Sequence, residues 1–392
     1  MAKRVGIEVS LAISEAVKQA KVDAIAAYPI TPQTHIVEHL SELVADAELD
    51  AAFIPVESEH SAMSVCAGTS AAGARTYTAT SSQGLALMNE ILYIIPALRL
   101  PIVMTIANRA LSGPISIWND HSDIMGARDT GWIAIFAENG QEAYDLTLQS
   151  FKIAEDHRVL LPISVNIDGF TLSHVIEPHE FLDQAEVDAF LPEYRPLAQL
   201  NPDQPVSMGM VGVPEIYAEA KKCQDEILKG SQKVIEEVFQ EFAERFGREY
   251  KVVESYRAEG AETLLLTMGS VSETAMEAID ILRDRQNRSV GLVRLRLWRP
   301  FPVEALRQAV AGCRNLAVLD RAVSFGAAGG PVAEEVRSAL YGIDGAPYIG
   351  SFIAGLGGRD ITIDDFIGLV DEVEKMAESN EIHQYKMTGV RE

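Results

Sequence analysis

The chain has 392 residues, and 57 acidic residues against 33 Lys and Arg give it a formal net charge of −24. This charge argues against a nucleic-acid binder and against basic anchoring to anionic lipid, because both functions need a positive surface. The longest apolar runs are well short of the roughly 20 residues that cross a bilayer. The first residues lack the apolar core of a secretory signal. We therefore expect a cytoplasmic protein with no membrane span and no nucleic-acid partner.

Hydrophobic residues make up 47% of the chain, which is enough for large cores, and the length suggests two or three domains. Cys66, Cys223 and Cys313 are scattered without C-x-x-C spacing. We expect each of them to be a small buried residue, because a disulfide framework or a cluster site needs grouped cysteines. The eight histidines form no metal-ligand motif, so we predict no metal site held by this chain.

Residues 1–170 alternate helical periodicity with short apolar runs, which is typical of a parallel sheet covered by helices on both faces. Predicted helices cover 5–20, 34–47, 59–73, 84–98 and 143–154. Predicted strands cover 23–28, 52–56, 75–81, 102–107, 134–138 and 159–168. The pattern predicts a first α/β domain.

Residues 171–258 have a different character, with several prolines and then a long charged helix over 215–246, and we interpret them as a linker or spacer. The alternation resumes in residues 259–392. Strands are predicted over 263–268, 290–295, 316–320 and 347–353, and helices over 272–285, 303–310 and 330–340. This is a second, smaller α/β domain.

The residues that carry chemistry are expected where the first domain's strands end, because open α/β sheets bind ligands outside the carboxyl ends of their strands. Four stretches follow predicted strands there, namely 28–32, 56–60, 80–84 and 107–110. They supply the carboxylates of Glu57 and Glu59, the guanidinium of Arg109 and the hydroxyl of Thr31. A helix start at 81–84 is suited to an anion, although no P-loop or G-x-G-x-x-G motif is present.

Structural roles are also open to these residues from their types alone. Glu59 at a helix start suits dipole complementation or capping. Arg109 suits a surface or interdomain ion pair, and Thr31 suits the N-cap of the helix over 34–47. His121 and Asp123 suggest a catalytic dyad, but a spacing of two residues in a loop need not bring them together. Asp120 and Asp123 are instead expected to fix the loop by local hydrogen bonds.

Five motifs occur in a fixed order over residues 28–123, and together they resemble one family. They are Y-P-I-T-P, E-S-E-H-S-A, T-S-S-Q-G-L-A-L-M-N-E, N-R-A-L-S-G-P and W-N-D-H-S-D. The chain resembles the alpha subunit of the 2-oxoacid:ferredoxin oxidoreductases, in the pyruvate:ferredoxin oxidoreductase branch. L-R-L-W-R-P-F-P and D-R-A-V-S-F-G-A-A-G-G-P extend the resemblance into the second domain.

The resemblance implies a thiamine-diphosphate pyrimidine-binding domain over 1–170 and a transketolase C-terminal-like α/β domain over 259–392. It implies oxidative decarboxylation of pyruvate to acetyl-CoA and carbon dioxide, reversible, with coenzyme A as co-substrate and ferredoxin as electron partner. A beta subunit is expected to hold Mg²⁺, the cofactor's diphosphate and a [4Fe-4S] cluster. Gamma and ferredoxin-like delta subunits are expected to carry further clusters, and a second copy of the whole assembly is expected.

The resemblance also assigns roles to residues. Glu59 matches the carboxylate that activates the pyrimidine ring, with Glu57 as the competing candidate. Arg109 and Thr31 are expected to bind the substrate's carboxylate or keto oxygen. The substrate pocket is expected to include Asn108, Pro29, Ile30, Ile117 and Trp118, and the cofactor site Glu59, Pro29, Ser82, Gln83 and Arg109.

The sequence leaves alternatives open. The same chemistry on a branched-chain, aromatic or indole oxoacid fits these residues, and a non-catalytic scaffold subunit keeps the same fold. The glycine-rich stretch 326–330 is expected to be a subunit contact rather than a phosphate site. Substrate, physiological direction, electron acceptor and stoichiometry are not contained in one chain.

Overall fold

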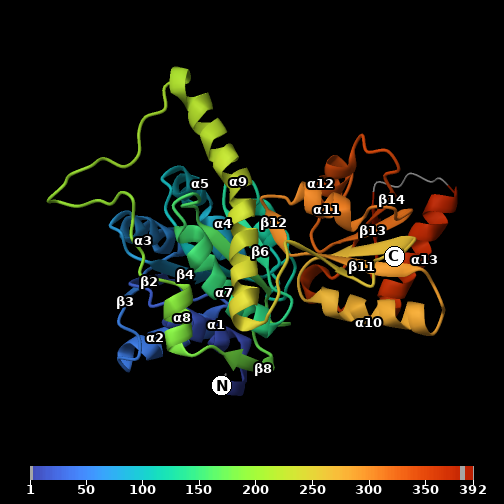
Figure 1. Ribbon diagram of the computed structural model, residues 1–392, viewed down its shortest axis with the longest axis horizontal. Coiled ribbons are helices and arrows are strands. Elements are labelled where there is room, and N and C mark those ends of the chain that lie inside the picture. The colour runs from blue at the N-terminus through green and yellow to red at the C-terminus, as the bar shows by residue number, and fades with distance from the viewer. Residues whose placement is uncertain (1–2, 380–384, 392) are drawn as a thin grey trace.

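The computed structural model describes residues 3–379 and 385–391, which form two α/β domains lying side by side (Figure 1). The first domain has a seven-stranded sheet. Its strands, in spatial order, are β12 (Leu297–Arg299), β6 (Ile133–Phe136), β7 (Ile163–Asp168), β5 (Val103–Asn108), β4 (Thr76–Thr80), β2 (Ala24–Ala27) and β3 (Ala52–Pro55). All neighbours are parallel except β12, which runs antiparallel to β6.

Helices cover both faces of this sheet because its central strands are buried on both sides. One hydrophobic cluster contains α1 (Val9–Gln19), α2 (Thr34–Ala45), α7 (Gly140–Glu155), α8 (Gln184–Phe190) and the second half of α9 (Pro214–Phe246). The cluster on the other face contains α3 (Glu59–Ala71), α4 (Ser82–Leu87), α5 (Asn89–Ala97) and α6 (Ser122–Ala127). The predicted α/β class is confirmed.

The second domain has a six-stranded sheet. In spatial order its strands are β15 (Lys386–Met387), β14 (Tyr348–Ile353), β13 (Asn315–Asp320), β10 (Thr263–Thr267), β11 (Val290–Leu295) and β9 (Val253–Tyr256). Its helices are α10 (Val271–Asp284), α11 (Val303–Ala309), α12 (Pro331–Leu340) and α13 (Ile363–Ser379), with a short 3-10 turn η1 (Leu356–Gly358). Every strand and helix predicted here is present to within a few residues.

The two domains share a hydrophobic cluster, so they are packed into one body. Phe136 and Trp298 from the first sheet lie in the same cluster as Leu264 and Val293 from the second. The chain also passes directly from β11 of one sheet to β12 of the other. Arg296, between these two strands, is fully buried and donates to Glu142 at 2.6 Å.

The structure corrects several of the predicted elements. Residues 5–8 belong to β1 (Lys3–Glu8), which pairs antiparallel with β8 (Ile176–Phe181), and the first helix begins only at Val9. The predicted helix over 84–98 is two helices, α4 and α5. Residues 171–258 hold β8, α8 and β9 in addition to the long helix. Cys66 and Cys313 are buried as expected, but Cys223 is exposed.

The long helix was predicted almost to the residue. It starts with Pro214 at its first position, and Gly247 ends it in the left-handed conformation at φ 73°. Its first turns and the extended segment before it project from the body (Figure 1). In the part of the chain that the structure describes, no helix has the length and apolar composition of a membrane span.

Candidate functional site

The four motif-bearing stretches converge at one edge of the first sheet. They follow β2, β3, β4 and β5, which are parallel neighbours in the order β3-β2-β4-β5. The chain passes from β2 outward to β3 and then returns to place β4 on the other side of β2. Ligands in open α/β sheets bind at such a reversal of strand order. The crevice is therefore expected between the turns after β2 and β4.

Burial separates the two carboxylates that compete for the catalytic role. Glu59 is the first residue of α3 and is only 6% exposed. Glu57 is exposed, and the hydroxyl of Ser61 donates to its carboxylate, which lowers its pKa. Ser58 rather than Glu59 is the N-cap of α3, and it accepts the backbone N–H of Ser61 at 3.2 Å. The carboxylate of Glu59 is thus free of the capping role that the sequence left open.

Gly84 lets α4 approach the carboxylate of Glu59. A Cβ at position 84 would lie 2.7 Å from Glu59 Oε1 and 2.5 Å from Thr80 Oγ1, distances that no side chain tolerates. The hydroxyl of Thr80 is buried and has no hydrogen-bond partner among the described residues. A buried hydroxyl without a partner is costly. The turn between β4 and α4 thus has a carboxylate, an unsatisfied hydroxyl and a glycine in contact, an arrangement that suits a heterocycle bearing hydrogen-bonding groups.

Arg109 is 7% exposed and lies at the end of β5, where burial lowers its pKa. Its Nη1 donates to the Thr31 carbonyl at 2.9 Å, and its Nε donates to the Ser116 carbonyl at 2.8 Å. These are backbone acceptors, so the guanidinium is not spent on the ion pair that the sequence allowed. Nη2 has no partner among the described residues. One side of the guanidinium therefore remains available to a substrate carboxylate.

The buried side chain of Gln33 holds the turn after β2 in place. Thr31 is exposed and does not cap α2, because Gln33 occupies the N-cap position. Gln33 is fully buried, and its amide nitrogen donates to the carbonyls of Tyr28 at 2.8 Å and Ala79 at 3.2 Å. Pro29 is exposed and Ile30 is half-buried. The sequence reasoning missed Gln33, whose position beside the motif was the only signal.

Asp123 fixes three of the site's elements at once. Its Oδ2 accepts the backbone N–H groups of Ser82 and Arg109, both at 3.0 Å. Its Oδ1 accepts Asn108 Nδ2 at 3.0 Å and its neighbour's backbone N–H at 2.8 Å. Burial raises the pKa of Asp123 to about 7. Asn108 is fully buried, and its Oδ1 has no hydrogen-bond partner among the described residues.

Ser82 and Gln83 begin α4. Ser82 is buried with φ 46°, a left-handed conformation that is strained for a residue with a side chain. Its Oγ lies 2.7 Å from the Ala110 carbonyl oxygen, and Gln83 is half-buried beside it. The hydroxyl of Ser82 thereby ties the turn after β4 to the loop after β5.

Ile117 and Trp118 lie on an exposed loop, at 41% and 53% exposure. The indole of Trp118 packs on Phe170 with ring centroids 4.7 Å apart. Gly358 of the second domain approaches so closely that a Cβ there would lie 2.5 Å from Trp118 Cβ. The second domain therefore supports one wall of the site.

His121 and Asp123 do not form a dyad. His121 Nε2 instead lies 3.0 Å from Asp168 Oδ1. Asp168 also forms an ion pair with Arg321 at 2.8 Å and accepts the backbone N–H of Ser270 at 2.8 Å. Burial opposes ionisation of Asp168, but the charge of Arg321 and the bond from His121 keep its pKa below the ordinary value. This buried group joins the two domains. Asp120 fixes its own loop through Ser122, as predicted.

One cluster of possible metal ligands is present among the described residues. Glu8, His35 and His174 bring one ligand atom each within 4.8 Å of one another. This cluster was not predicted, because its three residues come from separate elements. His35 Nδ1 lies 2.7 Å from Glu8 Oε1, so these two groups satisfy one another directly.

Comparisons with known proteins identify the family. The family described as pyruvate flavodoxin/ferredoxin oxidoreductase, thiamine diphosphate-binding, matches residues 15–240, and pyruvate:ferredoxin oxidoreductase core domain II matches residues 261–366. Pyruvate synthase subunit PorA of Methanothermobacter thermautotrophicus is 51% identical, over 91% of each chain. Ketoisovalerate oxidoreductase subunit VorA of Pyrococcus abyssi is 43% identical, over 95% of this chain and 93% of that one.

Two solved structures share the fold. A 2-oxoglutarate:ferredoxin oxidoreductase from Magnetococcus marinus, with 2-oxoglutarate, coenzyme A and succinyl-CoA bound, gives a TM-score of 0.70 at 20% identity, over 96% of this chain and 66% of that chain. A split-gene transketolase gives a TM-score of 0.58 at 11% identity, over 95% of this chain and all of that chain. The family resemblance drawn from the motifs is confirmed: the chain belongs to the thiamine-diphosphate-binding pyruvate flavodoxin/ferredoxin oxidoreductase family.

Proposed function

We propose that this chain is the catalytic alpha-type subunit of a 2-oxoacid:ferredoxin oxidoreductase that acts on pyruvate. The observation that carries the proposal is the buried carboxylate of Glu59 against Gly84 and the unsatisfied hydroxyl of Thr80. The names of the relatives support pyruvate as substrate. The overall reaction converts pyruvate and coenzyme A to acetyl-CoA and carbon dioxide and passes two electrons to ferredoxin, and it is reversible.

Bound thiamine diphosphate would supply the electron sink for decarboxylation, and the residues of this chain would bind and orient it. Glu59 would share a proton with the pyrimidine ring of the bound cofactor, and Gly84 would leave room for that ring. Arg109 binds the substrate carboxylate through Nη2, and the exposed hydroxyl of Thr31 donates to the carboxylate or keto oxygen. Ile117 and Trp118, together with Pro29 and Ile30, line the substrate pocket in this proposal.

Asn108, Ser82 and Gln83 have supporting roles in this proposal. Ser82 is buried and bonded to neighbouring protein atoms, so it positions the turn before α4. Asn108 donates to Asp123 through Nδ2, and its buried Oδ1, which has no hydrogen-bond partner among the described residues, keeps it assigned to the substrate pocket. Gln83 is half-buried at the start of α4. Of Ser82 and Gln83, we therefore assign contact with the cofactor to Gln83. We assign 1–170 to the pyrimidine-binding domain, 171–258 to the connection and 259–392 to the second domain.

Partner subunits complete the site in this proposal. A beta subunit holds Mg²⁺, the diphosphate and a [4Fe-4S] cluster, and gamma and delta subunits carry electrons to ferredoxin. The cysteines here support this division, because Cys66, Cys223 and Cys313 lie in different parts of the fold. Burial raises the pKa of Cys66 to about 12 and of Cys313 to about 11, which keeps both as thiols. A cluster typically takes about four grouped thiolates.

The identity of one relative favours a second substrate class. A ketoisovalerate oxidoreductase subunit is 43% identical to this chain, so a branched oxoacid competes with pyruvate. Measuring kcat/KM with the assembled enzyme distinguishes pyruvate from a branched oxoacid as the substrate. The compounds to test are pyruvate, 2-ketoisovalerate, phenylglyoxylate and indolepyruvate. Pyruvate is expected to lead, and a higher kcat/KM for 2-ketoisovalerate would overturn the substrate assignment.

The subunit proposal is tested by expressing this chain alone and together with its partner subunits. The chain alone is expected to contain no iron and to reduce no viologen dye with pyruvate. The assembly is expected to contain iron and to reduce the dye. An iron-bearing, active preparation of the single chain would overturn the multi-subunit proposal. An assembly with full activity after Glu59→Gln would instead favour a scaffold subunit.

A further inference from the structure

A pocket of about 400 Å³ lies in the second domain, at the carboxyl ends of β14 and β15. Ile353, Leu356 and Val390 give it apolar surface, and Thr388 adds a hydroxyl. The volume lies in the range of small-molecule sites, and the position is the edge where open α/β sheets bind ligands.

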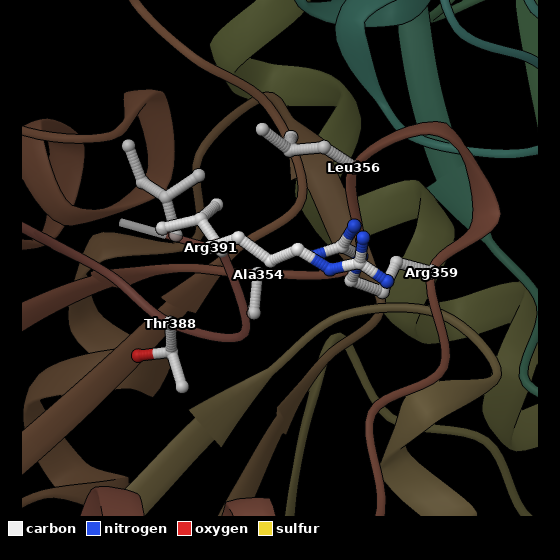
Figure 2. Close-up of a pocket in the computed structure, with 8 residues that line it drawn as sticks. Ala354, Leu356, Arg359, Thr388 and Arg391 are labelled. Carbon is white, nitrogen blue, oxygen red and sulfur yellow. The ribbon is translucent and has the colours of Figure 1, made fainter.

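Two arginines line this pocket. Figure 2 shows Arg359 and Arg391 reaching toward the same part of it, one from the turn after β14 and the other from the segment after β15. Arg359 Nη1 donates to the Gly389 carbonyl. Among the described residues neither arginine has a carboxylate partner, and the side chain of Arg391 has no hydrogen bond.

Both side chains are exposed, and neither meets a carboxylate among the described residues, although the chain carries a net charge of −24. Two guanidinium groups in one pocket repel each other unless a negative charge lies between them. Guanidinium forks match the oxygens of phosphate groups with two parallel hydrogen bonds.

We infer that this pocket binds a phosphate-bearing anion, with Arg359 and Arg391 on the phosphate oxygens, Thr388 as a further donor and the apolar wall against an organic part. Pyrophosphate serves as the minimal probe. The phosphates of a nucleotide-like coenzyme and a free phosphate present the same chemistry, and the experiment below distinguishes them.

The turn that carries Arg359 is also the turn that supports the first domain. The backbone N–H of Gly357 donates to Asp120 Oδ2 at 3.2 Å, and Gly358 packs on Trp118. An anion held by Arg359 restrains this turn and so steadies the loop of Trp118. Occupancy is expected to be visible as a change in Trp118 fluorescence.

Isothermal titration of the full chain with phosphate, pyrophosphate, coenzyme A and dephospho-coenzyme A tests the inference. Pyrophosphate is expected to bind, and Arg359→Gln and Arg391→Gln each to weaken binding about tenfold or more, because each loses charged hydrogen bonds. Arg285→Gln is the matched control, since it removes an exposed positive charge from the same domain. Its binding is expected to equal that of the wild type, and melting curves check the fold of all three variants.

The source of the phosphate follows from the coenzyme pair. If coenzyme A binds more tightly than dephospho-coenzyme A, and Arg391→Gln removes this difference in affinity, the site binds a terminal monophosphate. Equal binding of both assigns it to a diphosphate, and binding of the inorganic ions alone assigns it to free phosphate. Two results would overturn the inference: no binding of any of the four compounds, or folded Gln variants that bind pyrophosphate as tightly as the wild type.

Discussion

Asp123 accepts the backbone N–H of Arg109 at 3.0 Å through the same buried oxygen that accepts the backbone N–H of Ser82. One carboxylate therefore sets the positions of the turns after β4 and β5 relative to each other. The residue proposed to bind the substrate and the helix start proposed to face the cofactor are coupled through it. Asp123 is therefore expected to position the site through these two turns, although its buried carboxylate does not contact substrate.

Asp123 makes stability depend on pH. Burial raises its folded pKa to about 7 from a model-compound value of 3.8. The folded chain therefore holds a proton that the unfolded chain releases. The stabilisation from this group is complete below the unfolded pKa and is lost as the pH rises through about 7. Its slope is at most about 1.4 kcal/mol per pH unit.

Urea unfolding between about pH 5 and pH 8 measures this dependence. Asp123→Asn cannot titrate, so its unfolding free energy is expected to fall less steeply with rising pH than that of the wild type. Asp320, whose pKa burial also raises to about 7, remains in both proteins and cancels in the comparison. Identical slopes for the two proteins would show that Asp123 does not titrate in this range.

Gly84→Ala tests the close approach of α4 to Glu59. The added methyl would lie 2.5 Å from Thr80 Oγ1, so the turn must move and the affinity for thiamine diphosphate is expected to fall at least tenfold. Gly68→Ala in α3 is the matched control. Nothing lies within 4 Å of its Cβ position, and alanine there is expected to stabilise the helix by up to about 1 kcal/mol. Equal cofactor affinity in both variants would remove Gly84 from the site.

Arg109→Lys keeps the charge but loses the planar fork. We expect a higher KM for pyruvate, with a smaller change in the affinity for thiamine diphosphate. Arg99→Lys is the control, because Arg99 is also partly buried and also donates to two backbone carbonyls, those of Val159 and Leu160. Its steady-state constants are expected to stay unchanged. A collapse of cofactor affinity at unchanged KM would assign Arg109 to the cofactor or to folding.

The periodic parts of the fold were predictable from the sequence, and the parts fixed by distant partners were not. Residues 5–8 are Val, Gly, Ile and Glu, and so short a stretch suits either a helix start or a strand. Pairing with β8, about 170 residues away, decides for the strand. β9 and β12 are short strands that pair with β11 and β6, respectively. No local sequence pattern predicted them.

The same limit applies to the site. Motif order placed Glu59, Arg109 and Thr31 at one sheet edge, because parallel strands end together. It did not show that Asn108 is fully buried and donates to Asp123, because that partner comes from a separate element. His121 pairs with Asp168 and not with Asp123. Asp168 lies at the end of β7, far from His121 in the sequence, so local spacing did not predict the pair. Hydrogen-bond partners across the fold leave no periodic trace in the sequence.

In the proposed function Glu59, and not Glu57, activates thiamine diphosphate. Exchange of the cofactor's C2 proton in the assembled enzyme measures this activation without requiring turnover of pyruvate. Glu59→Gln is expected to slow the exchange by about 10²–10⁴, the usual effect of losing a positioned acid–base group. Glu57→Gln, with an exposed side chain two residues away, is expected to exchange at the wild-type rate. Wild-type exchange in Glu59→Gln, with the cofactor still bound, would contradict the account.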